Sequence, residues 1–287
     1  MTGILIVDKP ADWTSQDVAA KLRGVFQERR VGHGGTLDPM ATGVLPIFLG
    51  RATRAVSFFE SAEKEYIAGL RLGCITDTQD TTGNTLEMRP VSVTEAKLRD
   101  ALASMEGPQE QIPPMYSAVK IGGKKLYELA RSGKEVERKP RSIVLHELEL
   151  LDFDGEEAHF RVHCSKGTYV RTICHDLGMK LGCGGCMSSL RRTKAGIYTL
   201  AQSYTMEQIL AGEANVLPVE SMFENYPAIT LSTAQEKLCR NGNPVPRCGF
   251  DEGEYRVYAQ DGTFLMFGRC SEETLYTTKS FFEVSHE

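Results

Sequence analysis

The chain has 287 residues, 41% of them hydrophobic, a length and composition that predict one large domain followed by a small one. No segment approaches the roughly 20 consecutive apolar residues of a membrane helix, and the apolar run 4–7 ends at charged residues, which argues against a signal peptide. The expectation is therefore a soluble, cytoplasmic protein, and a monomer. The formal net charge of -5 argues at first sight against a nucleic-acid partner, although its distribution along the chain matters more than the total.

The first elements are predicted to be a strand and a helix. The apolar residues that follow Gly3 read as a buried strand that breaks at Pro10. Thr14 and Asp17 then have the spacing of a capping box. The apolar residues behind this cap fall on one helical face: Val18, Leu22, Val25 and Phe26.

Residues 31–50, VGHGGTLDPMATGVLPIFLG, have the composition of a contact loop. Their glycines permit backbone conformations with positive φ or a close approach to a ligand. Asp38 precedes Pro39, which pushes its backbone toward extended geometry and holds its carboxylate on a stiffened piece of loop. From these residues alone, Asp38 is either such a held carboxylate or the cap of a simple turn.

A second helix is expected within residues 52–59, followed by a half-buried strand over residues 64–72 whose apolar face begins at Tyr66. A tyrosine at such a position is normally a core residue. Further along, Ser92 and Glu95 have the spacing of another capping box and predict a third helix.

Residues 112–141 are predicted to form an exposed arm. Pro113 and Pro114 restrict its start to an edge or an extended connection. The segment 120–141 carries eight Lys/Arg against three Glu, with no wide apolar face. This composition suits an RNA backbone better than a membrane, with a solvated helix surface as the alternative.

A hairpin across Asp154-Gly155 leads into a helix that is predicted to open near Thr168. Arg171 would then lie in the first turn, where a cation opposes the helix dipole. A carboxylate should compensate it, and Asp38 is the candidate. A bidentate pair would fix the aspartate and favour its ionised form. The alternative is an arginine on a solvated helix end.

The eight cysteines lack the density of a disulfide scaffold and are expected to be reduced. Cys183 and Cys186 form one CxxC pair, with Cys174 and His175 upstream. A structural zinc site needs a second pair at a recognisable spacing, so no metal site is predicted. The absence of a P-loop and of a dinucleotide fingerprint likewise predicts no cofactor.

After Phe223 the sequence predicts a second, strand-rich segment. A short helix is predicted from Ser232, and a hairpin across Asp261-Gly262 follows it. Residues 251–287 contain eight acidic side chains against three basic ones, which makes this strand-rich segment a weak primary RNA binder.

Several motifs together resemble one family. GHGGTLDPMATGVLP is similar to the signature GHTGTLDPxATGxLP of the TruB-type tRNA pseudouridine synthases, which isomerise the uridine at position 55 in the T-arm of tRNA. DKP at the first strand, KEY, the TDTQDTTG loop, the YVR of SKGTYVRT and SLRRT match further family motifs. The resemblance covers nearly all of residues 3–200.

The resemblance implies an α+β pseudouridine synthase fold, with a mixed, mostly antiparallel sheet and a central cleft. The implied domains are a catalytic domain over residues 1–223, with a basic RNA-binding insertion at about 112–141, and a PUA-like domain over 227–287. The implied partner is the T-arm of tRNA.

The resemblance also assigns the site residues. Asp38, Tyr66 and Arg171 would be catalytic, with Arg171 holding Asp38 and Tyr66 stacking on the uracil, where it could accept the C5 proton. The remaining substrate-binding residues would be His33, Tyr169, Leu190 and Lys9. Gly34 stands where the family has threonine, and Gly185 and Cys186 stand where it has alanine and histidine.

Two other functions stay open at this point. A non-catalytic tRNA-binding or tRNA-folding protein could use the same cleft. A carboxylate-dependent nucleosidase or glycosidase usually needs two carboxylates, and no second one stands in a comparable motif.

Overall fold

A nine-stranded sheet forms the body of the molecule. The computed structural model describes residues 1–117 and 119–282. The main path of the sheet runs in the order β1 (Gly3–Lys9), β3 (Thr42–Leu49), β12 (Gly185–Ala195), β4 (Lys64–Leu72), β11 (Glu157–Cys164), β10 (Arg141–Phe153) and β7 (Gly107–Gln111). Off this path, β2 (Val31–His33) pairs with β3, and β13 (Tyr198–Thr199) pairs with β12.

The sheet is mixed and mostly antiparallel, as predicted. The pair of β12 with β3 is parallel, whereas the other pairs along the main path are antiparallel. The strand order places β12, which comes late in the chain, between β3 and β4. This crossover brings the SLRRT strand beside the strand that carries Tyr66.

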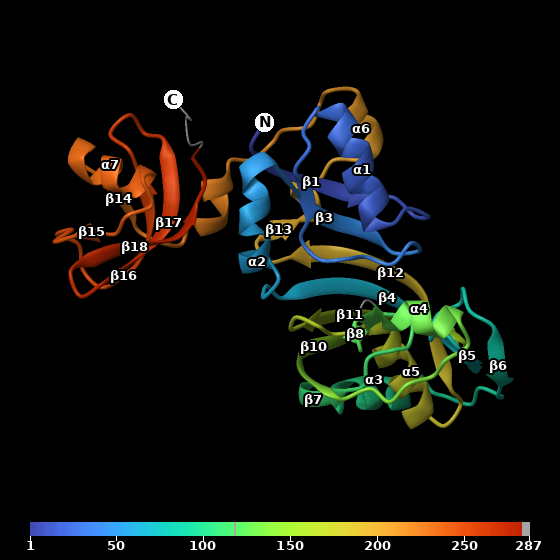
Figure 1. The fold of residues 1–287 in the computed structure, drawn as a ribbon. Coiled ribbons are helices and arrows are strands. Elements are labelled where there is room, and N and C mark those ends of the chain that lie inside the picture. The colour runs from blue at the N-terminus through green and yellow to red at the C-terminus, as the bar shows by residue number, and fades with distance from the viewer. Residues whose placement is uncertain (118, 283–287) are drawn as a thin grey trace.

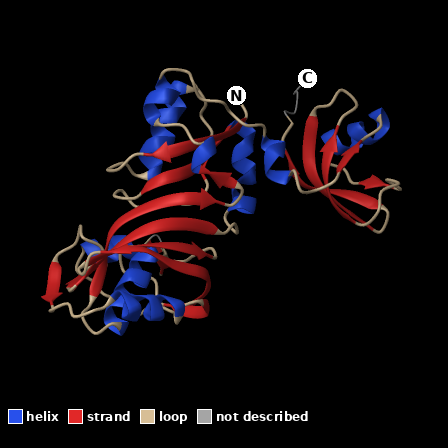
Figure 2. Ribbon diagram, turned by 180° about the vertical axis from the view of Figure 1, so that it is seen from behind, coloured by secondary structure: helices blue, strands red, loops and turns tan. Residues whose placement is uncertain are grey.

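Helices cover the two ends of the sheet (Figure 1 and Figure 2). The helices of the body are α1 (Ser15–Val25), α2 (Val56–Phe59), α3 (Glu95–Ala103), α4 (Leu126–Arg131), α5 (Val170–Lys180) and α6 (Met206–Leu210), whereas α7 (Thr233–Arg240) lies beside the C-terminal sheet. Short 3-10 turns are η1 (Gly50–Ala55), η2 (Leu200–Gln202) and η3 (Val219–Phe223). Around the sheet, α1 and α6 lie near β1, whereas α3 and α5 lie at the opposite end with β10 and β7 (Figure 1).

The helix starts show where sequence cues succeed and fail. The capping box of Thr14 with Asp17 is present at α1, as predicted. The predicted cap at Ser92 is wrong: Thr94 is the N-cap of α3, and its hydroxyl accepts from the Lys97 amide. A capping hydroxyl has to stand directly before the first helical turn, and Ser92 is too far upstream to do so.

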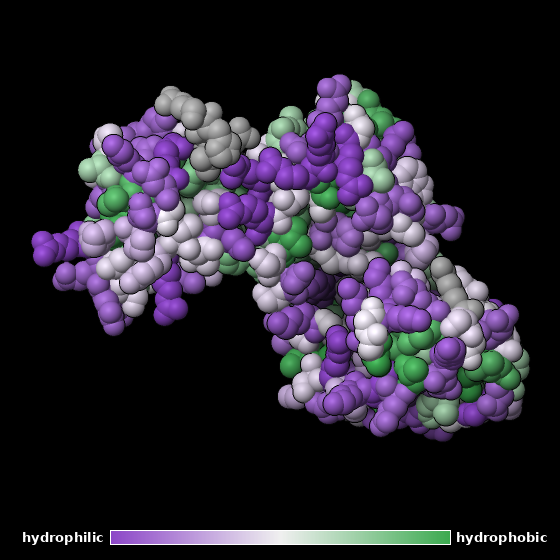
Figure 3. Space-filling view, in the orientation of Figure 1, coloured by the Kyte–Doolittle hydropathy of each residue, from purple (hydrophilic) through white to green (hydrophobic). Residues whose placement is uncertain are grey.

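Two ribbons project from the lower part of the body. One pairs β5 (Cys74–Thr76) with β6 (Thr85–Met88), and the other pairs β8 (Lys120–Ile121) with β9 (Lys124–Lys125). The second ribbon turns at Gly122 and Gly123, both at positive φ, and leads into α4, as predicted for the basic arm. Figure 3 shows that apolar side chains gather on the lobe that carries α4, while the rest of that face is mostly hydrophilic.

A second sheet forms the small C-terminal unit. Its order is β14 (Ala228–Thr230), β16 (Gly253–Tyr258), β17 (Phe264–Ser271), β18 (Thr274–Ser280) and β15 (Val245–Pro246). The predicted hairpin across Asp261-Gly262 is the β16–β17 pair, and the helix predicted from Ser232 is α7. The predicted α+β class with a β-rich C-terminal part is confirmed.

The two units share a core. Phe223, at the end of the body, stacks on Phe267 of β17 with ring centroids 4.5 Å apart. Phe58 of α2 meets both rings edge-on. These aromatic side chains belong to one buried cluster with Ile4 and Ile6 of β1, so the small unit packs on the edge of the large sheet.

Within the described residues, no helix is long and apolar enough to cross a membrane. All eight cysteines are buried and free, as expected of reduced packing residues.

Candidate active site

Asp38 and Arg171 form an ion pair across 133 positions of sequence. Arg171 Nε lies 2.9 Å from Asp38 Oδ2, and its Nη2 lies 3.3 Å from Oδ1. The Arg171 side chain is 7% exposed, and the Asp38 side chain is 36% exposed. The predicted pairing is therefore present, with the guanidinium buried behind a carboxylate that still reaches solvent.

The loop that carries Asp38 is held by buried groups on the first strand and helix. The Leu37 amide donates to Ser15 Oγ at 2.8 Å. The Lys9 amine donates to the carbonyl oxygens of Pro10, Trp13 and Pro39, the last at 3.1 Å. Because Lys9 is fully buried, its amine is committed to the loop backbone rather than turned to the surface.

Arg171 lies in the first turn of α5, as predicted, and its remaining donors meet backbone oxygens. Nη1 donates to the Thr78 carbonyl at 3.3 Å, and Nη2 donates to the Tyr116 carbonyl at 2.9 Å. The guanidinium thus ties the Asp38 loop, the loop before β6 and the start of the basic arm to the same point. These contacts fix the plane of the guanidinium and with it the orientation of the Asp38 carboxylate.

Asp80 is a second carboxylate at the site that sequence reasoning missed. Its Oδ2 lies 3.8 Å from Arg171 Nη1, and its side chain is 7% exposed. Its Oδ1 accepts from the hydroxyls of Thr78 and Thr82. The TDTQDTTG motif contained the signal, because an aspartate flanked by threonines forms such local hydrogen bonds. Buried behind Arg171, Asp80 is placed to hold the guanidinium.

Burial raises the pKa of Asp38 above its usual value of 3.8. The charge of Arg171 lowers it again, and the neighbouring Asp80 raises it further. Arg171 favours the ionised form, as predicted, and the loss of hydration outweighs this effect.

Tyr66 and Leu190 lie on one face of the sheet. In the β4–β12 register Tyr66 is opposite Arg192, and Leu190 is opposite Ala68. Paired residues, and residues two apart on a strand, share a face, so Tyr66, Leu190 and Arg192 point the same way. Tyr66 and Leu190 are 9% and 8% exposed. Tyr66 also lies within electrostatic reach of Asp38.

Tyr169 is the N-cap residue of α5, two positions before Arg171. Its backbone is clamped by Gln111: the Tyr169 amide donates to Gln111 Oε1 at 2.8 Å, and its carbonyl accepts from Nε2 at 3.1 Å. The clamp fixes the backbone of Tyr169, whose side chain is half-exposed, at the start of the helix that carries Arg171.

His33 ends β2, just before the Asp38 loop. Burial and the charge of Arg192 both lower its pKa, so the imidazole is neutral at pH 7. Its Nδ1 is buried without a hydrogen-bond partner within the part of the chain that the structure describes.

The departures from the family signature have local causes. A Cβ added at Gly34 would lie 2.5 Å from Phe59 Cδ1, so a threonine there would have to displace the Phe59 ring. A Cβ at Gly185 would lie 2.9 Å from Leu70 Cδ1 and 3.2 Å from the Cys174 carbonyl oxygen, where α5 crosses β12. Cys186 is fully buried, and burial raises the pKa of its thiol to about 12.

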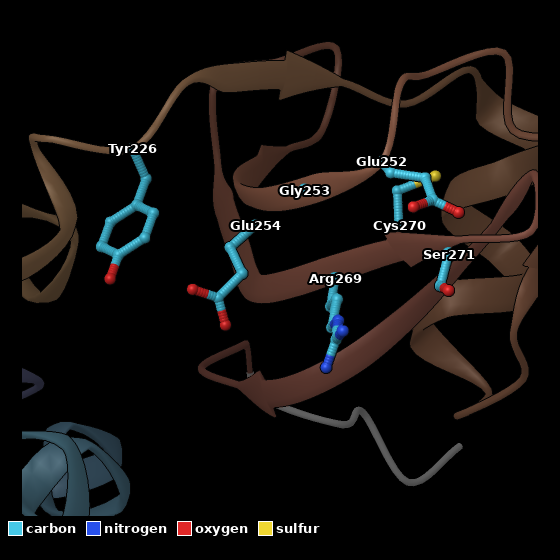
Figure 4. A pocket seen from close by; sticks show the side chains of 7 residues that line it. All are labelled: Tyr226, Glu252, Gly253, Glu254, Arg269, Cys270 and Ser271. Carbon is cyan, nitrogen blue, oxygen red and sulfur yellow. The ribbon is translucent and has the colours of Figure 1, made fainter.

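Two cavities lie away from this ion pair. One of about 420 Å³ is in the small unit, where Glu254 and Arg269 stand opposite each other on β16 and β17 (Figure 4). Another of about 350 Å³ lies at the junction beside Phe58 and Phe223. Neither is lined by a predicted site residue. Over residues 1–117 and 119–282, no cluster of three or more His, Cys, Asp or Glu side chains could hold a metal ion.

Two family profiles match consecutive parts of the chain. The profile of the TruB family pseudouridylate synthase N-terminal domain matches residues 23–170, and that of the tRNA pseudouridylate synthase B C-terminal domain matches residues 171–224. The second match includes β12, so it describes part of the large sheet and not the small C-terminal unit.

Relatives named tRNA pseudouridine synthase B match nearly the whole chain. The protein of Pseudomonas fluorescens is 41% identical, and the match covers 95% of this chain and 93% of that protein. The protein of Syntrophomonas wolfei is also 41% identical, and the match covers 99% of this chain and 100% of that protein.

Solved structures confirm the predicted fold. A chain in a crystal structure of a Cbf5-Nop10-Gar1 complex superposes with a TM-score of 0.74 at 25% identity, over 98% of this chain and 85% of that chain. The predicted enzyme class, an isomerase that converts uridine in tRNA to pseudouridine, is confirmed by the relatives above. The chain belongs to the TruB family of pseudouridylate synthases.

Proposed function

We propose that this protein isomerises the uridine at position 55 in the T-arm of tRNA, with Asp38 as the catalytic carboxylate. One observation carries the proposal: a buried guanidinium holds Asp38 by two contacts while 36% of the aspartate side chain stays exposed. A carboxylate fixed in this way is ready for a substrate that enters from the open side, without the entropic cost of positioning it during the reaction.

The reaction exchanges one glycosidic bond for another. The bond between C1′ and N1 breaks, the uracil turns, a bond between C1′ and C5 forms, the C5 proton leaves, and N1 takes up a proton. The nucleotide has to leave the stack first, which costs a few kcal/mol. Asp38 acts in its ionised form whether it attacks the nucleoside or removes a sugar proton. The scheme uses no cofactor.

The other site residues have roles that follow from their placement. Tyr66 stacks on the extruded uracil, and Leu190 on the same sheet face forms the wall of the pocket. The Tyr169 hydroxyl donates a hydrogen bond near the reacting centre, and the neutral His33 fills the gap that the flipped nucleotide leaves. For Lys9 a positioning role is better supported than substrate contact, because its amine already donates to three carbonyls.

The basic arm, residues 112–141, is the proposed contact with the RNA backbone. Its Tyr116 carbonyl accepts from Arg171, so the arm meets the catalytic ion pair directly. RNA bound along the arm would therefore pass over Asp38. Neutralisation of phosphates by the arm predicts an affinity that falls with rising salt.

We propose the same two domains that the sequence predicts. The catalytic domain spans residues 1–223, and the small PUA-like domain spans residues 227–287, with the boundary between η3 and β14. We propose that the protein acts as a cytoplasmic monomer on the T-arm.

The test uses T-arm stem-loop RNA with tritium at C5 of a single uridine. Release of tritium from RNA labelled at position 55, pseudouridine in the digest, and no release from RNA labelled at another loop uridine are expected. Free uracil would identify a nucleosidase, and tight binding without release would identify a non-catalytic tRNA-binding protein. Either outcome would overturn the proposal.

A further inference from the structure

Arg192 is a buried cation beside the catalytic pocket. Its side chain lies on β12 opposite Tyr66, and the residue is 1% exposed. Its Nε donates to the Val44 carbonyl at 2.7 Å, and its Nη2 donates to the Gly35 carbonyl at 3.2 Å. In the register of β12 with β4 the guanidinium shares a sheet face with the Tyr66 phenol, and the two groups interact electrostatically.

Within the described part of the chain, no carboxylate lies within ion-pair distance of Arg192; its contacts are carbonyls and a phenol. Burying a guanidinium without a counter-ion is costly. A neutral donor could hydrogen-bond to the same carbonyls at a lower desolvation cost. Linking β3 to β12 therefore does not explain why a charged side chain is buried here. The remaining partner on which a positive charge has a chemical effect is the Tyr66 oxygen.

A guanidinium has donors and no acceptor. Toward Arg192 the Tyr66 oxygen can therefore act only as an acceptor, and its own proton has to point elsewhere. A neighbouring cation also stabilises a phenolate more than a phenol. Both effects leave the oxygen better able to receive a proton.

We propose that Arg192 is a positioning residue that acts through Tyr66, holding the phenol oxygen as the acceptor of the C5 proton of the target uridine. This rests on the proposed function. In the step, which follows formation of the C1′–C5 bond, the C5–H bond breaks and the proton goes to the ionised Tyr66 oxygen, which had lost its own proton to solvent. The electron pair of the C5–H bond forms the C5–C6 double bond, the C6–N1 double-bond pair moves to N1, and N1 takes up a proton from solvent.

Other groups act on the same phenol. Burial raises the pKa of Tyr66, and Arg192 opposes that rise. Cys164 on β11 and Asp38 on its loop both raise the pKa of Tyr66. The titratable groups whose pKa the charge of Arg192 lowers are the amines of Lys9 and Lys64 and the imidazole of His33. Among the groups that act on Tyr66, Arg192 is the cation that favours its ionised form.

The first experiment needs no RNA. Protein labelled with ¹³Cζ-tyrosine is titrated by NMR, and the Tyr66 resonance is assigned by its loss in Tyr66→Phe. We expect Arg192→Met to raise the Tyr66 midpoint by about one pH unit or more and Arg192→Lys to raise it by less. Arg191→Met is the matched control, because Arg191 pairs with Asp8 and is half-exposed, and it should leave the midpoint unchanged.

The second experiment measures tritium release between pH 7 and pH 9. Because the pKa of Tyr66 is raised above its usual value of 10, the phenol is mostly protonated in both proteins over this range, so Arg192→Met should release tritium about tenfold more slowly at every pH, with RNA affinity unchanged. An unmoved Tyr66 midpoint, or tritium release by Arg192→Met at the wild-type rate, would overturn the proposal. If Arg192→Met does not fold, Arg192→Lys decides alone by the same criteria. A wild type that releases no tritium refutes the proposed function instead, while the titration still reports on Arg192.

Discussion

At Asp38, burial and the Arg171 guanidinium act on one carboxyl group in opposite directions. Burial prevails, so the pKa of Asp38 is raised above 3.8. A carboxylate with a raised pKa is a stronger base and nucleophile than one on the surface. The ion pair therefore keeps Asp38 oriented without removing its reactivity.

The acid limb of the pH–rate profile should show this shift. The ionised form is active, so activity is lost as pH falls through the raised pKa of Asp38, at a midpoint above 3.8. The measurement is single-turnover tritium release across pH, with circular dichroism as a control for folding. A midpoint at or below 3.8 contradicts the proposed environment of Asp38.

Lys9 should make stability depend on alkaline pH. Burial lowers the pKa of Lys9 from 10.5 to about 8. Between these values the unfolded chain binds more protons, so the free energy of unfolding rises with pH. Replacing Lys9 by methionine should remove up to about 3 kcal/mol of that rise. Denaturant unfolding at several pH values measures it. The exposed Lys21→Met is the control and should keep the wild-type slope, and an unchanged slope in Lys9→Met refutes the assignment.

The pairing of Asp38 with Arg171 could be predicted from the sequence, because a cation in a first helical turn calls for a carboxylate. The buried Lys9, Asp80 and Arg192 could not. Their partners are mostly backbone carbonyls and hydroxyls that only the folded chain brings together, and a lysine or arginine in sequence carries no sign of its burial.

Among the elements, α5 depends on a close approach to β12. A Cβ added at Gly178 would lie 2.2 Å from the Gly185 amide nitrogen and 2.4 Å from the Gly184 carbonyl carbon. The same helix begins with Arg171, so its distance from the sheet sets where the guanidinium meets Asp38. The glycine that replaces the family's alanine at position 185 belongs to this contact.

Gly178→Ala should push α5 away from β12. We expect a loss of about 1–3 kcal/mol in stability from overpacking. Because Arg171 moves with the helix, activity should fall more than RNA affinity. Thermal unfolding and tritium release measure the two effects, and Lys180→Ala, exposed on the same helix, is the control. Wild-type stability and activity in Gly178→Ala would refute this account.

Element types were largely predictable, because periodicity and turn residues are local signals. The β4 and β12 strands, the hairpin of β10 with β11, and α7 were all found. The strand order could not be predicted. The insertion of β12 between β3 and β4 depends on contacts between residues that are far apart in the sequence. The edge strand β7 was also missed, because its sequence GPQEQ lacks an apolar alternation.

At the scale of the whole molecule, the shared aromatic cluster joins the two units. Phe223, Phe267 and Phe58 pack together across the junction, and Arg54 donates to the Ser280 carbonyl and hydroxyl beside them. An overall charge of -5 hides a basic arm on one unit and an acidic surface on the other. The junction keeps the acidic unit at the edge of the sheet near β1 (Figure 1).

The shared cluster predicts one cooperative unfolding transition. Phe267→Ala should cost about 3–5 kcal/mol and separate the unfolding of the small unit from that of the body. Differential scanning calorimetry distinguishes one transition from two. Tyr276→Ala is the control, because Tyr276 is 45% exposed on the same sheet. Two transitions in the wild-type protein would contradict the shared core.

The most direct test of the account compares Asp38→Asn with the wild type on T-arm RNA labelled with tritium at position 55. The variant keeps the shape of the side chain, so RNA affinity should change by less than about threefold, while tritium release should fall at least about a thousandfold. Asp100→Asn, exposed on α3, should match the wild type. Release retained by Asp38→Asn, or lost only in proportion to binding, would contradict the catalytic role of Asp38.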